Sequence, residues 1–236
     1  MNSDRSRGTR THDQIRLDIL HGKWAPGEKL QPVSLSAVYK TSTTVVREAL
    51  TRLAGEGFVS IEPNRGFFMR TLSLSELRDI TEVRCRMEEL GVTLAVGRGD
   101  LKWESELTAV HHQLSRTPRR GADDPQHVAD EWSRVHEAFH AKIIEASGVP
   151  VLTNLCRHLW ESTELYRRWA APLPKASTRD VESEHAEILE AVLDRDADRA
   201  ATLLREHYET TVNVILNSGL VKTGQTEAID VVAADF

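Results

Sequence analysis

The stretch STTVVREALTRLAGEGFVSIEPNRGFFMR, residues 42–70, decides the fold of the N-terminal part of the chain. Its first half places apolar residues at helical spacing, which predicts a helix that is capped by Ser42, buries Val46 and Leu53 and ends near Gly57. Its second half has two apolar runs on either side of the turn sequence PNRG, a pattern typical of a β-hairpin. The stretch therefore predicts a helix followed by a hairpin.

Two more helices are expected before this stretch. Residues 11–22 carry apolar side chains on one helical face after a capping box that starts at Thr11, and Gly22 is placed to end that helix. A short helix capped by Ser34 follows. Three helices and a hairpin make a winged helix-turn-helix, which we assign to residues 1–70.

The outward face of the helix after Ser42 is a candidate surface for DNA. Short hydroxyls and long cations on that face suit base edges and phosphates. They belong to Thr43, Thr44, Arg47, Thr51 and Arg52. Residues 1–70 also hold 11 Lys and Arg against 7 Asp and Glu, whereas the whole chain has a net charge of −6. A solvated helix face, with Arg47 paired to Glu48 or Glu56, is the commoner explanation for either arginine taken alone.

The rest of the chain is expected to form helices only. Residues 71–218 show helical periodicity without strand alternation, which predicts an antiparallel all-helical bundle. Residues 219–236 show no periodicity and are expected to form a frayed tail. The predicted fold class is therefore mainly α, with an N-terminal winged helix-turn-helix followed by a helical bundle.

Composition excludes several classes of protein. A chain of 236 residues with 40% hydrophobic and 28% charged residues is expected to be soluble and ordered rather than fibrous or disordered. No apolar run approaches the roughly 18 residues that cross a bilayer, and no signal peptide is evident, so we expect a cytoplasmic protein without a membrane partner. Two cysteines, Cys85 and Cys156, are too few for a disulfide framework.

Four of the ten histidines are predicted to point into the bundle. His136 and His140 lie one helical turn apart beside an apolar stripe, and His185 and His207 occupy apolar-face positions on two later helices. Imidazoles that converge from several helices can bind a divalent metal. Any one of them taken singly is more often a hydrogen-bonded core residue, so both interpretations are kept at this point.

Several motifs resemble those of the GntR superfamily of bacterial transcriptional regulators. The blocks that resemble its DNA-binding signature are PGEKL (26–30), VREALTRL (46–53), EGFV (56–59) and RGF (65–67). The blocks that resemble the FCD effector domain of the FadR-like subgroup are RCRME (84–88), FH (139–140), ASG (146–148) and HAEILEA (185–191), with Asp196 and His207 after them. The resemblance implies a ligand-responsive repressor that is not an enzyme, with its effector-binding and dimerisation domain in the bundle.

The resemblance implies DNA contacts in the helix and the wing. Arg47 would clamp a phosphate, while Ser42 and Thr44 would approach the operator. Arg65 and Gly66 would form the wing tip near the minor groove. A homodimer is expected on double-stranded operator DNA, because one small winged helix binds weakly and the operator is expected to be a short inverted repeat. The full set of candidate DNA contacts is Ser42, Thr43, Thr44, Arg47, Arg52, Arg65 and Gly66.

The resemblance also implies a metal that binds a carboxylate. In the FCD pattern an acidic residue stands four positions before the first histidine and joins three histidines as a metal ligand; here His136 takes its place. An all-imidazole site favours zinc, nickel or copper over manganese or magnesium, and we expect zinc or nickel. Its ligands would be His136, His140, His185 and His207. Arg84 would clamp the carboxylate of a small organic acid effector, or would pair with Glu88 four residues on.

Two alternatives remain at this point. The run HEAFH (136–140) matches the HExxH motif of zinc metallopeptidases, in which the glutamate, here Glu137, activates a zinc-bound water. Three fixed positions arise easily by chance, the extended motif is missing, and no strand is expected to align a peptide, so we expect Glu137 to be a solvated surface charge. The other alternative is a regulator whose effector pocket holds no metal.

Overall fold

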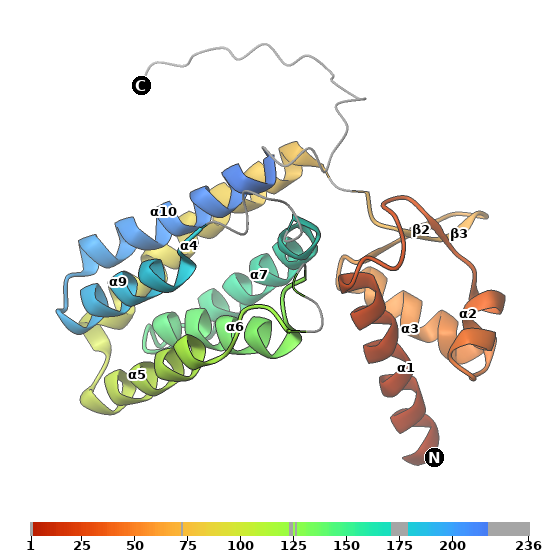
Figure 1. Ribbon diagram of the computed structural model, residues 1–236, viewed down its shortest axis with the longest axis horizontal. Helices are drawn as coiled ribbons and strands as arrows, with labels where there is room; N and C mark the ends of the chain where they lie inside the picture. Colours follow the sequence, from red (N-terminus) through yellow and green to blue (C-terminus); the bar gives the residue numbers. More distant parts are fainter. Residues whose placement is uncertain (1, 72, 123–124, 126, 171–178, 217–236) are drawn as a thin grey trace, which may run out of the picture.

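The computed structural model describes residues 2–71, 73–122, 125, 127–170 and 179–216. It is mainly helical, and Figure 1 shows two groups of elements beside each other. The first group consists of α1 (Asn2–Leu20), β1 (Lys29–Leu30), α2 (Pro32–Val38), α3 (Thr43–Gly55), β2 (Val59–Glu62) and β3 (Gly66–Met69). The second consists of α4 (Leu74–Arg98), α5 (Leu101–Arg116), α6 (Asp130–Glu145), α7 (Pro150–Ala170), α9 (Val181–Leu193) and α10 (Ala197–Leu216). The predicted fold class is confirmed.

Helix α3 forms where the sequence predicts it. The Ser42 hydroxyl accepts a hydrogen bond from the Val45 amide at 3.2 Å, which caps the first turn. The apolar face of the helix is buried and consists of Val46, Ala49, Leu50 and Leu53. Because this face points into the core, the hydroxyls and arginines on the other side of α3 face solvent.

The hairpin also forms as predicted, in a register that runs from Val59 opposite Met69 to Glu62 opposite Gly66. Gly66 has a φ of +103°, a conformation that a side chain would strain, so the turn needs glycine there. A third strand, β1, pairs antiparallel with β3 and completes the sheet. Sequence analysis missed it because two residues are too few to show an alternation.

Two predicted helix starts are wrong. Helix α1 begins at Asn2, so Thr11 lies inside it and does not start a capping box; residues 2–10 contain no proline that would stop the helix from extending. Helix α2 begins at Pro32, whose fixed φ suits a first helical turn, and is not capped by Ser34. The predicted end of α1 is right, because Gly22 adopts a φ of +73° just after it.

The two groups of elements bury apolar residues in two clusters. One is the bundle core, to which α6 contributes Val135, Phe139 and Ile143. The other lies between α1, α3 and the sheet, and it also takes in residues of the bundle. These bundle residues are Leu77 of α4, Leu165 and Tyr166 of α7, and Val212 and Ile215 of α10. Helix α7 contacts α1 of the winged helix-turn-helix directly.

The interior of the bundle is not wholly apolar. Helix α4 buries Thr81, Arg84 and Glu88 together with its apolar residues. Buried charges require partners, so these residues mark the part of the bundle where a polar site is expected. The boundary predicted between residues 70 and 71 falls between β3 and α4, and the tail predicted at 219–236 lies outside the described residues. Within the described chain no helix has the length and apolar character needed to span a membrane.

Candidate metal and effector site

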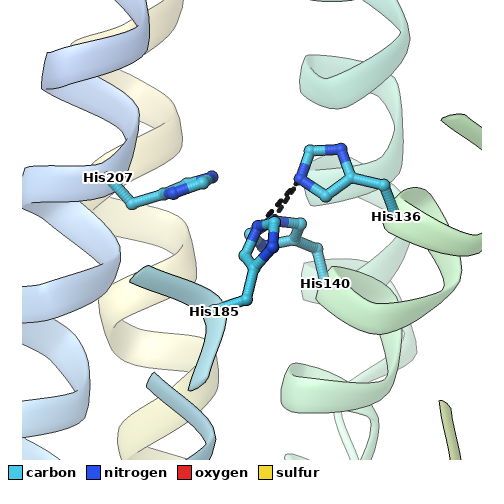
Figure 2. Close-up of side chains that lie close together, drawn as sticks. All are labelled: His136, His140, His185 and His207. Carbon is cyan, nitrogen blue, oxygen red and sulfur yellow. Dashed lines mark hydrogen bonds between the residues drawn. The ribbon is translucent and has the colours of Figure 1, made fainter. Parts of the chain in front are cut away.

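The structure brings together the four histidines that the sequence singles out. Helix α6 supplies His136 and His140, α9 supplies His185 and α10 supplies His207 (Figure 2). All four side chains are buried, and one ring nitrogen from each lies within 4.8 Å of the others. Nε2 of His136 lies 3.0 Å from Nε2 of His185 and 3.1 Å from Nε2 of His140. Three helices thus form one imidazole cluster.

Hydrogen bonds from neighbouring residues orient two of these rings. The Tyr208 hydroxyl donates to Glu88, so its oxygen accepts from Nδ1 of His140 at 2.8 Å. Nδ1 of His207 donates to the Glu184 carboxylate at 2.7 Å, a shorter contact than the one that Arg179 makes with the same nitrogen at 3.2 Å. With the proton on Nδ1, each ring keeps a free lone pair on Nε2.

Burial keeps the four imidazoles neutral. It lowers the pKa of His136, His140 and His185 well below 6.5, and the neighbouring histidines lower it further. The pKa of His207 falls to about 4, because burial outweighs its hydrogen bond to Glu184. Glu184 stays ionised: burial opposes this, but hydrogen bonds from His207 and Arg179 lower its pKa to about 2. At neutral pH each imidazole of the cluster is therefore uncharged and has one ring nitrogen whose lone pair can bind a metal.

These donors fit a divalent metal ion. Metal binding requires neutral imidazoles, which burial supplies here. Zinc–nitrogen bonds of about 2.0–2.1 Å place the nitrogens of a tetrahedral site roughly 3.4 Å apart. The ring-nitrogen separations, from 3.0 Å to at most 4.8 Å, span that value. Tyr208 and Glu184 also make the hydrogen bonds to the distal ring nitrogens that metal-binding histidines usually have.

Arg84 forms the ion pair that the sequence left open, and its role toward an effector stays a prediction. Its Nε donates to Glu88 at 2.6 Å, so the expected ion pair along α4 is present. The side chain is buried, yet one terminal nitrogen, Nη2, has no hydrogen-bond partner among the described residues. The guanidinium lies 3.8 Å from the ring centre of Tyr208 and lines a cavity together with His136 and His207. A buried donor without a partner is costly, so Nη2 is placed to bind an acceptor from a ligand.

Sequence analysis missed two residues of α7 that complete this cavity. Trp160 is buried against the rings of His136 and His140, at centroid distances of 4.9 Å and 5.3 Å. Arg167 lies over the same indole, 4.0 Å from its centre, and lines the cavity beside Arg84. Burial and the nearby Arg84 charge lower the pKa of Arg167 to about 9, so it stays a cation at neutral pH. No motif in the sequence around Trp160 or Arg167 marks either residue as part of the site.

The expectation that Glu137 is a solvated surface charge is wrong. Its side chain is half-buried and lines a second cavity with His140, between α6 and α7. Burial raises the pKa of Glu137, and the nearby carboxylates of Glu164 and Glu161 raise it further. Rotation of one residue along α6 takes Glu137 out of the histidine cluster, as predicted, but turns it toward α7 rather than toward solvent.

The candidate DNA contacts are accessible. Ser42, Thr43, Thr44, Arg47, Arg52 and Arg65 are exposed, and Gly66 is half-buried. Among the described residues no carboxylate pairs with Arg47, and Glu56 instead pairs with His12 at 2.7 Å. The ion pairs expected of Arg47 on an ordinary solvated helix are therefore absent from the described part of the chain. At the wing, Arg65 pairs with Glu62 and lies 5.2 Å from the ring centre of Phe68.

A chain of ion pairs leads from a cavity beside His136 and His207 to the end of α3. Arg168 and Glu164, which line this cavity, pair at 3.2 Å. Glu164 also accepts a hydrogen bond from Arg16 of α1 at 2.8 Å. Arg16 in turn lies 3.9 Å from Glu56, which caps the C-terminal end of α3. The bundle and the winged helix-turn-helix are thus joined by charges as well as by apolar contacts.

Comparison with known proteins matches both parts of the chain. Residues 8–69 match the family described as "Bacterial regulatory proteins, gntR family", and residues 79–210 match the FCD domain. The chain is 32% identical over 212 residues to the HTH-type transcriptional regulator BphR of Paraburkholderia xenovorans (strain LB400), which covers 90% of this chain and 86% of that one. It is 32% identical over 204 residues to the HTH-type transcriptional repressor GlaR of Escherichia coli (strain K12), which covers 85% and 92% respectively.

Solved structures share the fold. The structure titled "E. coli McbR/YncC" superposes with a TM-score of 0.69 at 21% identity, over 89% of this chain and 97% of that one. A putative GntR transcriptional regulator from Rhodococcus sp. RHA1 superposes with a TM-score of 0.68 at 22% identity, over 90% and 99% of the two chains. At this level of identity the likeness shows the arrangement of helices and wing.

The winged helix-turn-helix and its attached helical bundle define a DNA-binding transcriptional regulator. In particular, the chain belongs to the GntR family and carries an FCD domain. The families and relatives it matches are transcriptional regulators and not enzymes, so the HEAFH run at 136–140 does not mark a metallopeptidase.

Proposed function

We propose that the protein is a repressor that binds operator DNA as a homodimer in the cytoplasm and responds to a small organic acid. The observation that carries the proposal is the buried cluster of four neutral imidazoles within the FCD domain. In this proposal His136, His140, His185 and His207 hold a divalent metal, zinc or nickel. When bound, the metal would supply a positive charge that attracts a carboxylate.

Arg84 is the residue of this chain that would receive the carboxylate. Its ion pair with Glu88 fixes the guanidinium in place, and the stack on Tyr208 leaves Nη2 without a partner. A guanidinium held in this way donates a charge-assisted hydrogen bond to an anion at little cost in side-chain entropy. Trp160 lines the same cavity, with the Arg84 guanidinium 4.8 Å from its ring centre.

The proposed operator contacts are the exposed N-terminal half of α3 and the wing. Ser42, Thr43 and Thr44 open α3, where amides and hydroxyls suit phosphates and base edges. Arg47 and Arg52 add cations on the same exposed face, and Arg65 and Gly66 lie at the wing tip. The name of the relative GlaR, a transcriptional repressor, supports repression as the mode of action.

Metal content of the purified protein tests the proposal. We expect about one zinc or nickel ion per chain by elemental analysis, and a higher unfolding temperature with the metal than without it, because metal binding stabilises the folded state. His185→Ala should lower both occupancy and unfolding temperature. The control is His158→Ala, which changes an exposed histidine on α7 and should alter neither.

One other result would favour a regulator without a metal. The contacts of His136 with His140 and His185 can serve as imidazole hydrogen bonds in a metal-free cluster. Absence of metal from the protein, together with unchanged stability on adding zinc or nickel, would reject the metal site and leave a hydrogen-bonded effector pocket.

A further inference from the structure

Arg167 is a half-buried cation, and no described carboxylate balances its charge by contact. Its guanidinium donates to the Thr163 hydroxyl and to the Trp160 carbonyl, both of them neutral acceptors. No described carboxylate lies within ion-pair distance of it, although Glu164 and Glu137 act on it from farther away. A partly desolvated guanidinium that contacts no anion is placed to bind one from a ligand.

Three other arginines of the cavity walls differ from Arg167, because each has a carboxylate partner. These pairs are Arg84 with Glu88, Arg168 with Glu164, and Arg179 with Glu184. A metal ion in the histidine cluster would add a second region of positive charge to the one at Arg167.

Arg167 and the histidine cluster face the same space. The two cavities beside the cluster share six lining residues, among them His136, Arg167 and His207; the others are Trp160, Thr211 and Ile215. Trp160 is the common floor, because the guanidiniums of Arg84 and Arg167 lie 4.8 Å and 4.0 Å from its ring centre. A single ligand lying along the indole could thus reach the metal and Arg84 with one end and Arg167 with the other.

We propose that the effector is a dicarboxylate, with one carboxylate at the histidine cluster and Arg84 and the second at Arg167. The inference rests on the proposed function, since it assigns the ligand class of the same site. Arg167 is then the residue that separates dicarboxylates from monocarboxylates of equal length, because only the former bring a charge for its guanidinium. Its fork of donors suits a carboxylate held by two hydrogen bonds.

Matched pairs of acids test the inference on the zinc-loaded, full-length protein. Dissociation constants are measured by calorimetry for succinate against butyrate, glutarate against valerate and adipate against hexanoate. We expect the dicarboxylate of the best-fitting length to bind about tenfold or more tightly than its monocarboxylate partner. Equal affinities within every pair would overturn the inference while leaving a carboxylate-binding regulator intact. If no acid of either class binds, the proposed effector site is wrong and the inference falls with it.

Variants at position 167 test the residue assignment. In Arg167→Gln the preference for the dicarboxylate should fall to about twofold or less, while the monocarboxylate keeps its affinity. Arg167→Lys keeps a cation and should retain part of the preference. It also provides a second test if Arg167→Gln folds poorly. The control Arg157→Gln removes an exposed arginine of the same helix and should leave the preference unchanged. An undiminished preference in Arg167→Gln would refute the role of Arg167.

Discussion

Two imidazoles of the cluster differ in the neighbour at the ring nitrogen that points away from the centre. His140 has the Tyr208 hydroxyl there and His207 has the Glu184 carboxylate. An ionised carboxylate raises the electron density of a ring more than a phenol does. His207 should therefore be a stronger metal ligand than His140. The cluster therefore combines one ring made more basic by a charge with another oriented by a neutral partner.

Residue-level prediction from sequence succeeded where spacing along one helix carries the information. His136 and His140 are four residues apart, as are Arg84 and Glu88, and helical geometry places such residues on one face. The Tyr208 contact with His140 joins residues 68 positions apart and depends on how α6 and α10 pack. Trp160 and Arg167 were missed for the same reason, since only packing brings α7 to the cluster.

Arg47 allows a test of the DNA contact at a single residue. It is exposed on α3 and free of ion pairs among the described residues, as a phosphate contact requires. We expect Arg47→Ala to weaken binding to operator and to unrelated duplexes alike, and to reduce the slope of log affinity against log salt by about one. Thr44→Ala should instead alter the preference between sequences. An unchanged salt slope in Arg47→Ala would remove the residue from the interface.

Among the elements, α7 serves both parts of the protein. Trp160 and Arg167 line the cavity beside the histidine cluster, and Leu165 and Tyr166 belong to the apolar cluster of the winged helix-turn-helix. The Tyr166 hydroxyl also accepts a hydrogen bond from the Ser73 amide at 3.1 Å, just before α4. A ligand that shifts α7 at the cavity must therefore disturb contacts with the winged helix-turn-helix.

Helix boundaries were predictable where a single residue fixes the backbone conformation or caps the helix. Gly22 and Ser42 mark the end of α1 and the start of α3 as expected, because positive φ and capping are properties of single residues. The start of α1 at Asn2 was missed because no residue there enforces a boundary. Strand β1 was missed because its pairing with β3 depends on where the hairpin lies in space.

The packing of α1 on α3 should depend on pH through His12. The hydrogen bond to Glu56 raises the pKa of His12 above 6.5, against the effect of burial. A histidine with a raised pKa stabilises the fold fully below its unfolded value, and this stabilisation is lost as pH rises through the folded value. We expect the wild-type protein to lose unfolding free energy from this source as pH rises above 6.5.

The matching measurement is urea unfolding of the wild-type protein and of His12→Gln on both sides of neutrality. Glutamine keeps a hydrogen-bonding side chain but does not titrate, so the variant should show a smaller loss of stability above pH 6.5. Parallel curves for the two proteins would show that the His12 pair with Glu56 contributes no pH dependence.

In the whole molecule the cavity and the operator-binding helix are joined through charges that the sequence does not reveal. Arg16 and Glu164 are 148 positions apart, yet they form the direct hydrogen bond between α1 and α7. Glu164 shares its carboxylate between Arg16 and Arg168, and Arg168 also pairs with Asp130. An anion in the cavity would attract Arg168 and weaken its ion pair with Glu164. The hydrogen bond between Glu164 and Arg16 would change as a result.

This arrangement predicts that Arg16→Gln uncouples effector binding from DNA binding. In the wild-type protein the tightest-binding acid of the dicarboxylate series should change operator affinity by about fivefold or more, within the usual range of coupling between two sites. In Arg16→Gln that change should shrink toward onefold, because the ion-pair link is cut, while metal content and acid affinity stay the same. Titration of labelled operator with and without the acid measures the ratio, and Arg157→Gln serves as the control on α7. If Arg16→Gln responds to the acid as strongly as the wild type, coupling runs through the apolar contacts of Leu165 and Tyr166 instead.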